Sequence, residues 1–294
     1  MYMAQKHSGS APDFWEENWE SGQFEESVRF MTVDPLRPLF ERYLRPDSLM
    51  LEGGCGMGNY VSYYSARGFN VIGLDFAQKA LKTLRTRQPN LKLCGGDVSR
   101  LPFADQSFDL YYSGGVVEHF EAGAHESLRE ARRVLKGEGV LLISVPYYSP
   151  LRKAMSPFRK AEWRVVDRPL IDTEQRADGK RFFQYAYTRR EFSAMLADAG
   201  LRVINTQGYA VLWGLYELPF LNKNGRSEFP SASAPVDKTE PAEVDVTPLI
   251  TESNSSLAKR LAVHEDASVP VLGLGLTFLK NTTANMMMYV CVRN

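Results

Sequence analysis

Residues 52–58, Glu52-Gly53-Gly54-Cys55-Gly56-Met57-Gly58, lie between a short apolar stretch and a segment with helical spacing. The stretch Ser48–Glu52 is predicted to be a strand, and the residues from Tyr60 to Arg67 a helix. Closely spaced glycines at such a turn let the backbone approach a ligand, and the helix N-terminus favours a carboxylate or phosphate. A tight turn without a ligand could have the same sequence, so the turn alone marks only a candidate site.

The spacing of the glycines limits the kind of ligand. Gly54, Gly56 and Gly58 form G-x-G-x-G, whereas the dinucleotide fingerprint is G-x-G-x-x-G. A nicotinamide or flavin cofactor is therefore disfavoured. Glu52 adds a carboxylate that could meet an ammonium group, directly or through water; the structural alternative is an acid that caps the following helix.

Strand and helix patterns alternate from Asp34 to Pro146. Helices are predicted over 34–44, Gln78–Arg87 and Gly123–Leu135, in addition to the helix after the glycine turn. Such alternation predicts a parallel sheet covered on both faces, with ligands bound at the carboxyl ends of its strands. The five strand segments are Ser48–Glu52, Val71–Leu74, Leu91–Cys94, Phe108–Ser113 and Val140–Val145.

Acidic residues follow the first three strands. Asp75 ends the second strand, where its two carboxylate oxygens could accept hydrogen bonds from both hydroxyls of a ribose. Phe76 could line an adenine pocket. Asp97 and Val98, beyond the third strand, could bind the adenine amino group and a ring nitrogen. Any one of these could be a solvated loop residue, but the ordered set with Glu52 indicates an adenosine site.

Further motifs stand in order along the chain: Glu52–Gly58, Gly73-Leu74-Asp75, Gly96-Asp97-Val98, Leu101-Pro102-Phe103-Ala104-Asp105-Gln106-Ser107-Phe108-Asp109, Ser113–Phe120 and Val134–Val140. Together they resemble the successive motifs of class I S-adenosylmethionine-dependent methyltransferases. The resemblance covers about Leu49 to Pro146. Its motifs are specific for the cofactor and not for the methyl acceptor.

The resemblance implies a Rossmann-like α/β fold: a seven-stranded, mostly parallel sheet with helices on both faces, plus lid and insertion helices. Leu201–Val211 and Met286–Val292 would form a C-terminal hairpin with one antiparallel strand, separated by a long insertion over 213–285. The implied cofactor is S-adenosylmethionine, which leaves as S-adenosylhomocysteine after in-line methyl transfer. The residues expected to hold it are Glu52, Gly53, Gly54, Cys55, Gly56, Gly58, Asp75, Phe76, Asp97, Val98 and Ser113.

The candidate catalytic residues are Glu118 and His119, which follow the fourth strand on the side expected for the acceptor. A general base is needed only where the attacking atom carries a proton, and His119 is the best placed of the four histidines. The alternative is that His119 only packs near the methionine part of the cofactor. Some quinone O-methyltransferases of the family have a metal-binding E-x-x-E-H here, but this chain has Gly115 at the first acid, so no metal is predicted.

The segment from Tyr147 to Arg190 mixes basic and aromatic residues. It could clamp a small-molecule acceptor that is anionic, aromatic or lipid-like, or bind single-stranded nucleic acid, or form lid helices with solvated basic faces. The whole chain has 35 basic and 35 acidic residues, which favours a small molecule over nucleic acid. An RNA methyltransferase and a non-catalytic module that binds the cofactor remain the two alternatives.

The remaining composition predicts a folded protein of the cytoplasm. The chain has 294 residues, 44% of them hydrophobic, and three scattered cysteines without metal-ligand spacing, which suits a reducing compartment. The N-terminus, Met1 to Ser10, has no apolar core of signal-peptide length, and no stretch of the chain approaches the length of a membrane span. The apolar run Val269–Leu279 is expected to be a buried helix rather than a lipid contact.

Four regions are predicted. Residues 1–33, which include the aromatic stretch Phe14–Trp19, form an N-terminal cap segment, and residues 34–146 form the S-adenosylmethionine-binding core. Residues 147–187 form a basic and aromatic lid. Residues 188–294 complete the core, with Thr188 capping a helix that ends at Gly200 and with a flexible insertion at about 222–256.

Overall fold

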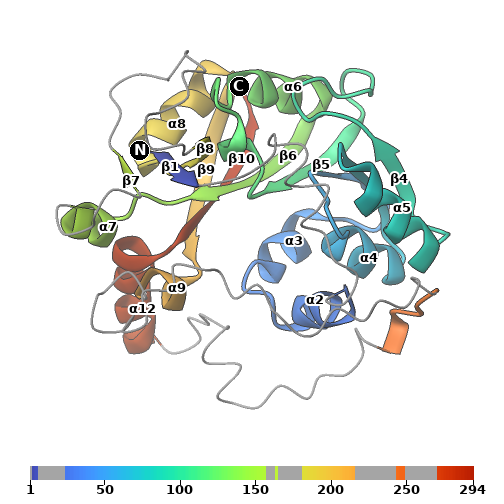
Figure 1. Cartoon of the computed structure of the whole chain (residues 1–294), viewed down its shortest axis with the longest axis horizontal. Helices are drawn as coiled ribbons and strands as arrows, with labels where there is room; N and C mark the ends of the chain where they lie inside the picture. The colour runs from blue at the N-terminus through green and yellow to red at the C-terminus, as the bar shows by residue number, and fades with distance from the viewer. Residues whose placement is uncertain (1, 6–23, 157–162, 165–180, 216–242, 249–269) are drawn as a thin grey trace.

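A computed structural model of the chain describes residues 2–5, 24–156, 163–164, 181–215, 243–248 and 270–294. Figure 1 shows the strands side by side through the centre of the molecule, with helices around them. The aromatic stretch Phe14–Trp19 and most of the predicted insertion at 222–256 lie outside the described residues.

The main sheet has seven strands in the order β4-β3-β2-β5-β6-β10-β9. The first five along the chain, β2 to β6, pair in parallel, whereas β10 is antiparallel to both of its neighbours, β6 and β9. This topology confirms the predicted Rossmann-like sheet and its antiparallel C-terminal strand. The strands are β2 (Leu49–Gly53), β3 (Asn70–Asp75), β4 (Lys92–Gly95), β5 (Phe108–Gly114), β6 (Leu135–Pro146), β9 (Leu201–Tyr209) and β10 (Met286–Arg293).

The order of the strands reverses at β2, which has β3 on one side and β5 on the other. In open α/β sheets, ligands bind beyond the carboxyl ends of the strands at such a reversal. The glycine turn follows β2 at this point, and the chain after β5 returns to it. The topology therefore brings residues 52–58, Asp75 and the segment after Gly114 to the same edge of the sheet.

Helices cover both faces of the main sheet and bury a separate hydrophobic cluster on each. One cluster includes Leu128 and Phe192, from α6 and α8, and the other includes Phe24, Phe40 and Val61, from α2, α3 and α4. The strand residues between them are apolar on both faces, as expected for a covered parallel sheet. The helices are α2 (Phe24–Phe30), the 3-10 turn η2 (Met31–Val33), α3 (Arg37–Tyr43), α4 (Asn59–Ala66), α5 (Gln78–Arg87), the 3-10 turn η3 (Val117–His119), α6 (His125–Val134) and α8 (Arg189–Asp198).

Helix α8 begins and ends as its sequence predicts. The Thr188 hydroxyl accepts a hydrogen bond from the Glu191 backbone N–H, and the Glu191 carboxylate accepts one from the Thr188 backbone N–H. This reciprocal pair satisfies two amides that the first turn would leave unpaired. Gly200, with φ of 77°, ends the helix in the left-handed region.

Strand β6 is longer than the sequence predicts. It begins at Leu135 rather than at Val140, because Leu135 pairs with Phe108 and the ladder then continues from Val140 opposite Leu110 across a bulge. The intervening residues, Lys136 to Glu138, are exposed, so their polar sequence had indicated a loop. Residues in a bulge are left out of the ladder, so their side chains need not alternate between apolar and polar.

A second sheet consists of three short strands. Strand β1 (Tyr2–Gln5) pairs antiparallel with β7 (Trp163–Arg164) on one side and β8 (Arg181–Tyr185) on the other. The N-terminal strand thus joins the region predicted as the lid. That region was expected to be helical, but in its described part only α7 (Pro150–Met155) is a helix.

Helix α12 (Pro270–Thr283) was predicted to be buried, but it is only partly covered. Phe278 and Leu279 have exposed fractions of 67% and 38%. Another part of the helix packs against α7 and α9 (Val211–Leu215), so an apolar composition did not reveal which face is covered. Within the described residues, none of the helices has the length and apolar character needed to cross a membrane.

Candidate functional site

The glycine turn has the backbone conformation that its sequence requires. Gly54, Gly56 and Gly58 all have positive φ, between 50° and 76°, a region that residues with a Cβ rarely adopt. A Cβ on Gly54 would lie 2.3 Å from Val116 Cγ2. The backbone N–H groups of Gly54 and Cys55 donate to the Leu74 carbonyl at 2.8 and 2.9 Å, which fixes the turn to the end of β3.

Glu52 lies beneath the turn with an exposed fraction of only 5%. Its Oε2 accepts a hydrogen bond of 2.7 Å from the Val61 backbone N–H, so the carboxylate does cap the first turn of α4. Burial, only partly offset by this bond and reinforced by the nearby Asp75, raises the pKa of Glu52 to about 8. Among the described residues Glu52 has no cationic partner. A ligand ammonium is the group that would favour its ionised form.

Asp75, at the end of β3, holds the turn from the other side. Its Oδ2 accepts from the Gly56 backbone N–H at 2.7 Å and its Oδ1 accepts from Ala77 at 2.8 Å. The side chain is buried, whereas the following Phe76 is exposed. Each carboxylate oxygen can accept a further hydrogen bond, so Asp75 can both order the turn and bind hydroxyl groups.

Asp97 and Val98 lie at the open side of the site. Asp97 is exposed, and its Oδ1 accepts a hydrogen bond of 2.8 Å from the Ser99 backbone N–H, while Val98 is buried. Asp97 also lines a surface hollow of about 820 Å³ with Ser99, Arg100, Glu126 and Glu130. The buried acids at β2 and β3 and the exposed acid after β4 thus occupy different depths at one sheet edge.

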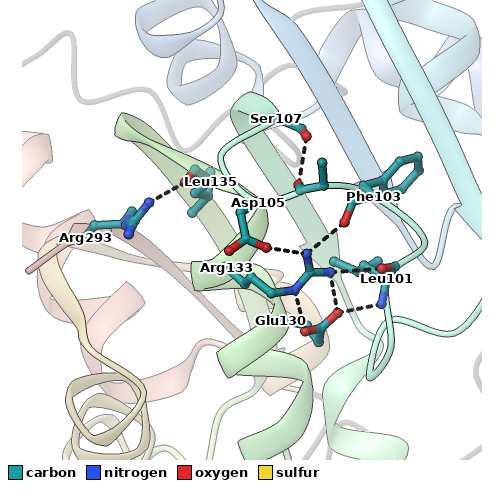
Figure 2. Close-up of polar contacts among 9 residues, drawn as sticks. Leu101, Phe103, Asp105, Ser107, Glu130, Arg133, Leu135 and Arg293 are labelled. Carbon is teal, nitrogen blue, oxygen red and sulfur yellow. Dashed lines mark hydrogen bonds and ion pairs between the residues drawn. The ribbon is translucent and has the colours of Figure 1, made fainter.

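The loop 101–107 that follows Asp97 is held by Arg133 on α6, a contact that the sequence did not reveal (Figure 2). The guanidinium donates to the carbonyls of Leu101 and Phe103 at 2.9 and 2.7 Å and to Asp105 Oδ1 at 2.8 Å. It also pairs with both oxygens of Glu130, which in turn accepts from the Leu101 backbone N–H at 2.7 Å. Arg133 therefore satisfies two backbone carbonyls of the loop, and Glu130 satisfies one of its amides.

Replacing Arg133 by alanine should lower the free energy of unfolding by about 2–3 kcal/mol, because the Leu101 and Phe103 carbonyls lose their charged donor. Arg129 is a matched control on the same helix, since it pairs only with the exposed Glu126 in the described structure. Arg129→Ala should change stability by less than ~0.5 kcal/mol. Urea unfolding measures both variants, and equal losses would contradict a clamping role for Arg133.

Ser113, Glu118 and His119 follow one another at the carboxyl end of β5. The chain turns there at Gly115, with φ of 71°, whose backbone N–H donates to the Ser144 carbonyl at 3.1 Å. Ser113 and Glu118 are buried, with exposed fractions of 1% and 2%. The structure thus brings Glu118 and His119, the two predicted catalytic residues, to the sheet edge that carries Glu52 and Asp75.

The His119 ring is directed toward the second sheet. Its Nδ1 lies 2.8 Å from the Phe183 carbonyl oxygen, and its ring packs edge-on against the Phe183 ring at a centroid distance of 5.0 Å. Burial, partly offset by this hydrogen bond, lowers the pKa of His119 to about 4. The ring is therefore neutral near pH 7 and is a poor proton acceptor.

Several tyrosines near this edge were missed by the sequence reasoning. Tyr60 donates to Asp34 Oδ2 by a very short hydrogen bond and packs against Tyr112, with the ring centroids 4.3 Å apart. Tyr209 donates to Ser144 Oγ at 2.9 Å. Tyrosine is common in cores, and these residues come from distant segments, so no local motif marks them. Within the described part of the chain, no cluster of three or more His, Cys, Asp or Glu side chains could bind a metal ion.

Comparison with known proteins agrees with this geometry. Residues 51–143 match the family described as a methyltransferase domain. A protein of Encephalitozoon cuniculi named as a methyltransferase is 29% identical over 58% of this chain and 77% of its own length. A probable S-adenosylmethionine-dependent methyltransferase of Mycobacterium tuberculosis is 32% identical over 38% of this chain, which spans only 42% of that relative. The chain spans about half the length of several curated relatives that it matches.

The same fold is found in a chain of the solved complex between the Haloferax volcanii methyltransferase activator Trm112 and a methyltransferase. Its TM-score is 0.53, with 17% identity, and the match covers 98% of this chain and 99% of that one. This likeness concerns the fold alone. The matched family, the relatives and the sheet topology together support a class I S-adenosylmethionine-dependent methyltransferase domain over residues 51–143.

S-adenosylmethionine is the cofactor of this family, and the residues present suit it. The buried Glu52 lacks a cation among the described side chains, which fits the ammonium of the methionine part. Asp75 offers two oxygens for ribose hydroxyls, and Asp97 with Val98 offers one carboxylate oxygen and a backbone N–H for adenine. One adenosine and one ammonium group are enough to occupy all of these side chains, so the second nucleotide of a dinucleotide cofactor is not needed.

Proposed function

We propose that this protein transfers the methyl group of S-adenosylmethionine to a small-molecule acceptor. The observation that supports it most directly is the row of acids Glu52, Asp75 and Asp97 after three neighbouring strands, beside a glycine turn in left-handed conformation. Gly53, Gly54, Cys55, Gly56 and Gly58 form the floor of the proposed site, and Phe76, Val98 and Ser113 complete it. The bound cofactor supplies an electrophilic methyl carbon, and these residues orient it and exclude water.

A small acceptor is favoured over RNA by the roles of two arginines of the lid region, Arg152 and Arg189, whereas Lys153 and Arg190 in the same region are exposed. Arg152 is buried and donates to the Tyr147 carbonyl and to Asn285, while Arg189 donates to Asn281 Oδ1 at 2.6 Å. These guanidinium groups hold the protein together rather than forming a solvated basic surface. Curated relatives named for their acceptors include a demethylmenaquinone methyltransferase of Renibacterium salmoninarum and a probable tRNA methyltransferase of Bos taurus, so relatives alone do not select the acceptor.

The test is release of S-adenosylhomocysteine from S-adenosylmethionine, measured by mass spectrometry with pools of small metabolites and, separately, with total tRNA. We expect turnover with at least one small-molecule pool and none above background with tRNA. Turnover with tRNA alone would contradict the proposed acceptor class. Tight cofactor binding with no turnover in any pool would instead favour the non-catalytic module.

Binding of S-adenosylhomocysteine should release a proton from Glu52. Because the pKa of Glu52 is about 8 in the free protein, the carboxyl is mostly protonated at pH 7, and a ligand ammonium would lower that pKa. Titration calorimetry in two buffers with different ionisation enthalpies should report close to one proton released at pH 7 and almost none above about pH 9. Glu52→Gln should remove the release and Glu118→Gln should keep it. Unchanged release in Glu52→Gln would show that another group titrates.

A further inference from the structure

Glu118 is a buried carboxyl group for which the fold offers no counter-charge. Its exposed fraction is 2%, its Oε2 has no hydrogen-bond partner among the described residues, and no ion pair among those residues includes it. Burying an unpaired acid is costly, so such a group in a native protein needs a functional explanation. Glu118 caps no helix and holds no described loop, unlike Glu52 and Glu130.

Two phenols, those of Tyr187 and Tyr209, lie close enough to Glu118 for its charge to affect them. Burial, followed by the charge of Glu118, raises the pKa of the Tyr187 phenol well above its usual value, and Glu118 also contributes to the raised pKa of Tyr209. The Tyr187 hydroxyl is buried and likewise has no hydrogen-bond partner among the described residues. His119 is turned to the Phe183 carbonyl. The surroundings therefore combine one carboxyl group, aromatic rings and hydroxyls.

This combination suits a cation and disfavours an anion. A carboxylate with aromatic rings attracts an ammonium group, whereas an anionic acceptor would bring a second negative charge to a buried acid. Burial also raises the pKa of Glu118 itself to about 8. The pKa values of amines are roughly 8–10, close to that of Glu118, whereas those of aliphatic alcohols are far higher. Transfer of a proton from an ammonium group to Glu118 therefore costs little free energy, and transfer from an alcohol would cost much more.

We propose that the acceptor is a small amine and that Glu118 is the catalytic residue that binds its ammonium form and receives its proton. This inference rests on the proposed methyl transfer and replaces the anionic acceptor expected from the basic residues. Binding of the ammonium first favours the ionised form of Glu118, whose proton leaves to water. The bound ammonium then gives one proton to the Glu118 carboxylate and becomes a neutral amine. The amine nitrogen then forms the new N–C bond, the methyl–sulfur bond breaks with its electron pair left on sulfur, and the methylated ammonium is the product. The proton on Glu118 passes to water.

Three probes that share a phenylethyl group separate the acceptor classes: 2-phenylethylamine, 2-phenylethanol and 3-phenylpropanoate. Their binding to the protein saturated with S-adenosylhomocysteine is measured by calorimetry, and their methylation by release of S-adenosylhomocysteine from S-adenosylmethionine. We expect the amine to bind at least 10-fold more tightly than the alcohol or the acid and to be the only probe methylated. Failure of the amine to bind, or equal binding of the acid, overturns the proposal. Methylation of the alcohol in preference to the amine would assign an O-methyltransferase.

Glu118→Gln keeps the size of the side chain and removes the charge. This variant should lose at least 100-fold in kcat/KM for the amine, while its affinity for S-adenosylhomocysteine stays within 3-fold of the wild type. Glu121→Gln is the control on the same segment, because Glu121 is only half-buried, and it should retain wild-type rates. Unchanged amine methylation in Glu118→Gln overturns the role of Glu118. If the wild-type protein does not bind S-adenosylhomocysteine at all, the proposed function is overturned.

Discussion

Asp75→Ala is expected to weaken the binding of S-adenosylhomocysteine by at least about 100-fold, which is roughly 2.7 kcal/mol or more. The substitution removes the oxygens proposed for the ribose hydroxyls. It also removes the acceptors for the Gly56 and Ala77 backbone N–H groups, so the glycine turn loses its preformed shape. A turn that must be ordered by the ligand binds it more weakly, because the cost of ordering is subtracted from the binding free energy.

The measurement is the rise in melting temperature on adding S-adenosylhomocysteine, followed by calorimetric titration. Wild-type protein should show the rise and Asp75→Ala should not. Asp47→Ala, in an exposed part of the chain, should behave as the wild type. Asp75→Asn retains one oxygen and should be folded more stably than Asp75→Ala, yet still bind poorly. A full ligand-induced shift in Asp75→Ala would exclude this residue from the site.

Gly54→Ala should destabilise the protein far more than Gly68→Ala, although both glycines have positive φ, 76° and 86°. A Cβ on Gly68 would meet no atom within 4 Å, so its cost is limited to the left-handed backbone, about 1–2 kcal/mol. A Cβ on Gly54 would meet Val116 Cγ2 at 2.3 Å. Overpacking adds about 1–3 kcal/mol, so Gly54→Ala should lose roughly 2–5 kcal/mol in total.

Urea unfolding of the two variants separates the backbone cost from the steric cost. Removing the obstructing methyl groups by Val116→Ala should restore part of the stability of Gly54→Ala, which a double-mutant cycle would detect as a favourable coupling. Equal losses in Gly54→Ala and Gly68→Ala would mean that the segment after β5 moves aside freely. In that case Gly115 and Val116 would not be fixed against the glycine turn.

The sequence was sufficient for the parts of the site that follow strands. Periodicity placed Glu52 and Asp75 at strand ends, and a parallel sheet aligns strand ends, so their proximity followed from the pattern. The predicted seven-stranded, mostly parallel sheet with an antiparallel C-terminal strand was confirmed, whereas the order of its strands came from the structure. Boundaries were less accurate where polar residues continue a strand, as at the start of β6.

Contacts between distant segments could not be predicted in this way. Arg133 reaches carbonyls 30 and 32 residues away, and nothing near it in the sequence indicates which loop it holds. The phenols near Glu118 come from residues 187 and 209, which only the folded sheet brings together. The pairing of β1 with β8 likewise joins segments almost 180 residues apart, without a motif in either. The exposed Phe278 shows that an apolar composition does not tell which side of a helix is buried.

The position of β10 also bears on how the protein forms in the cell. Of the seven strands in the main sheet, β10 is the last to leave the ribosome, yet it lies between β6 and β9 and pairs with both along its length. Until it arrives, β6 and β9 each present an unpaired edge, and unpaired edges attract other chains. Pairing across more than 140 residues is slow to form. Newly made chains therefore pass through an interval in which the edges of β6 and β9 are open to pairing with other chains.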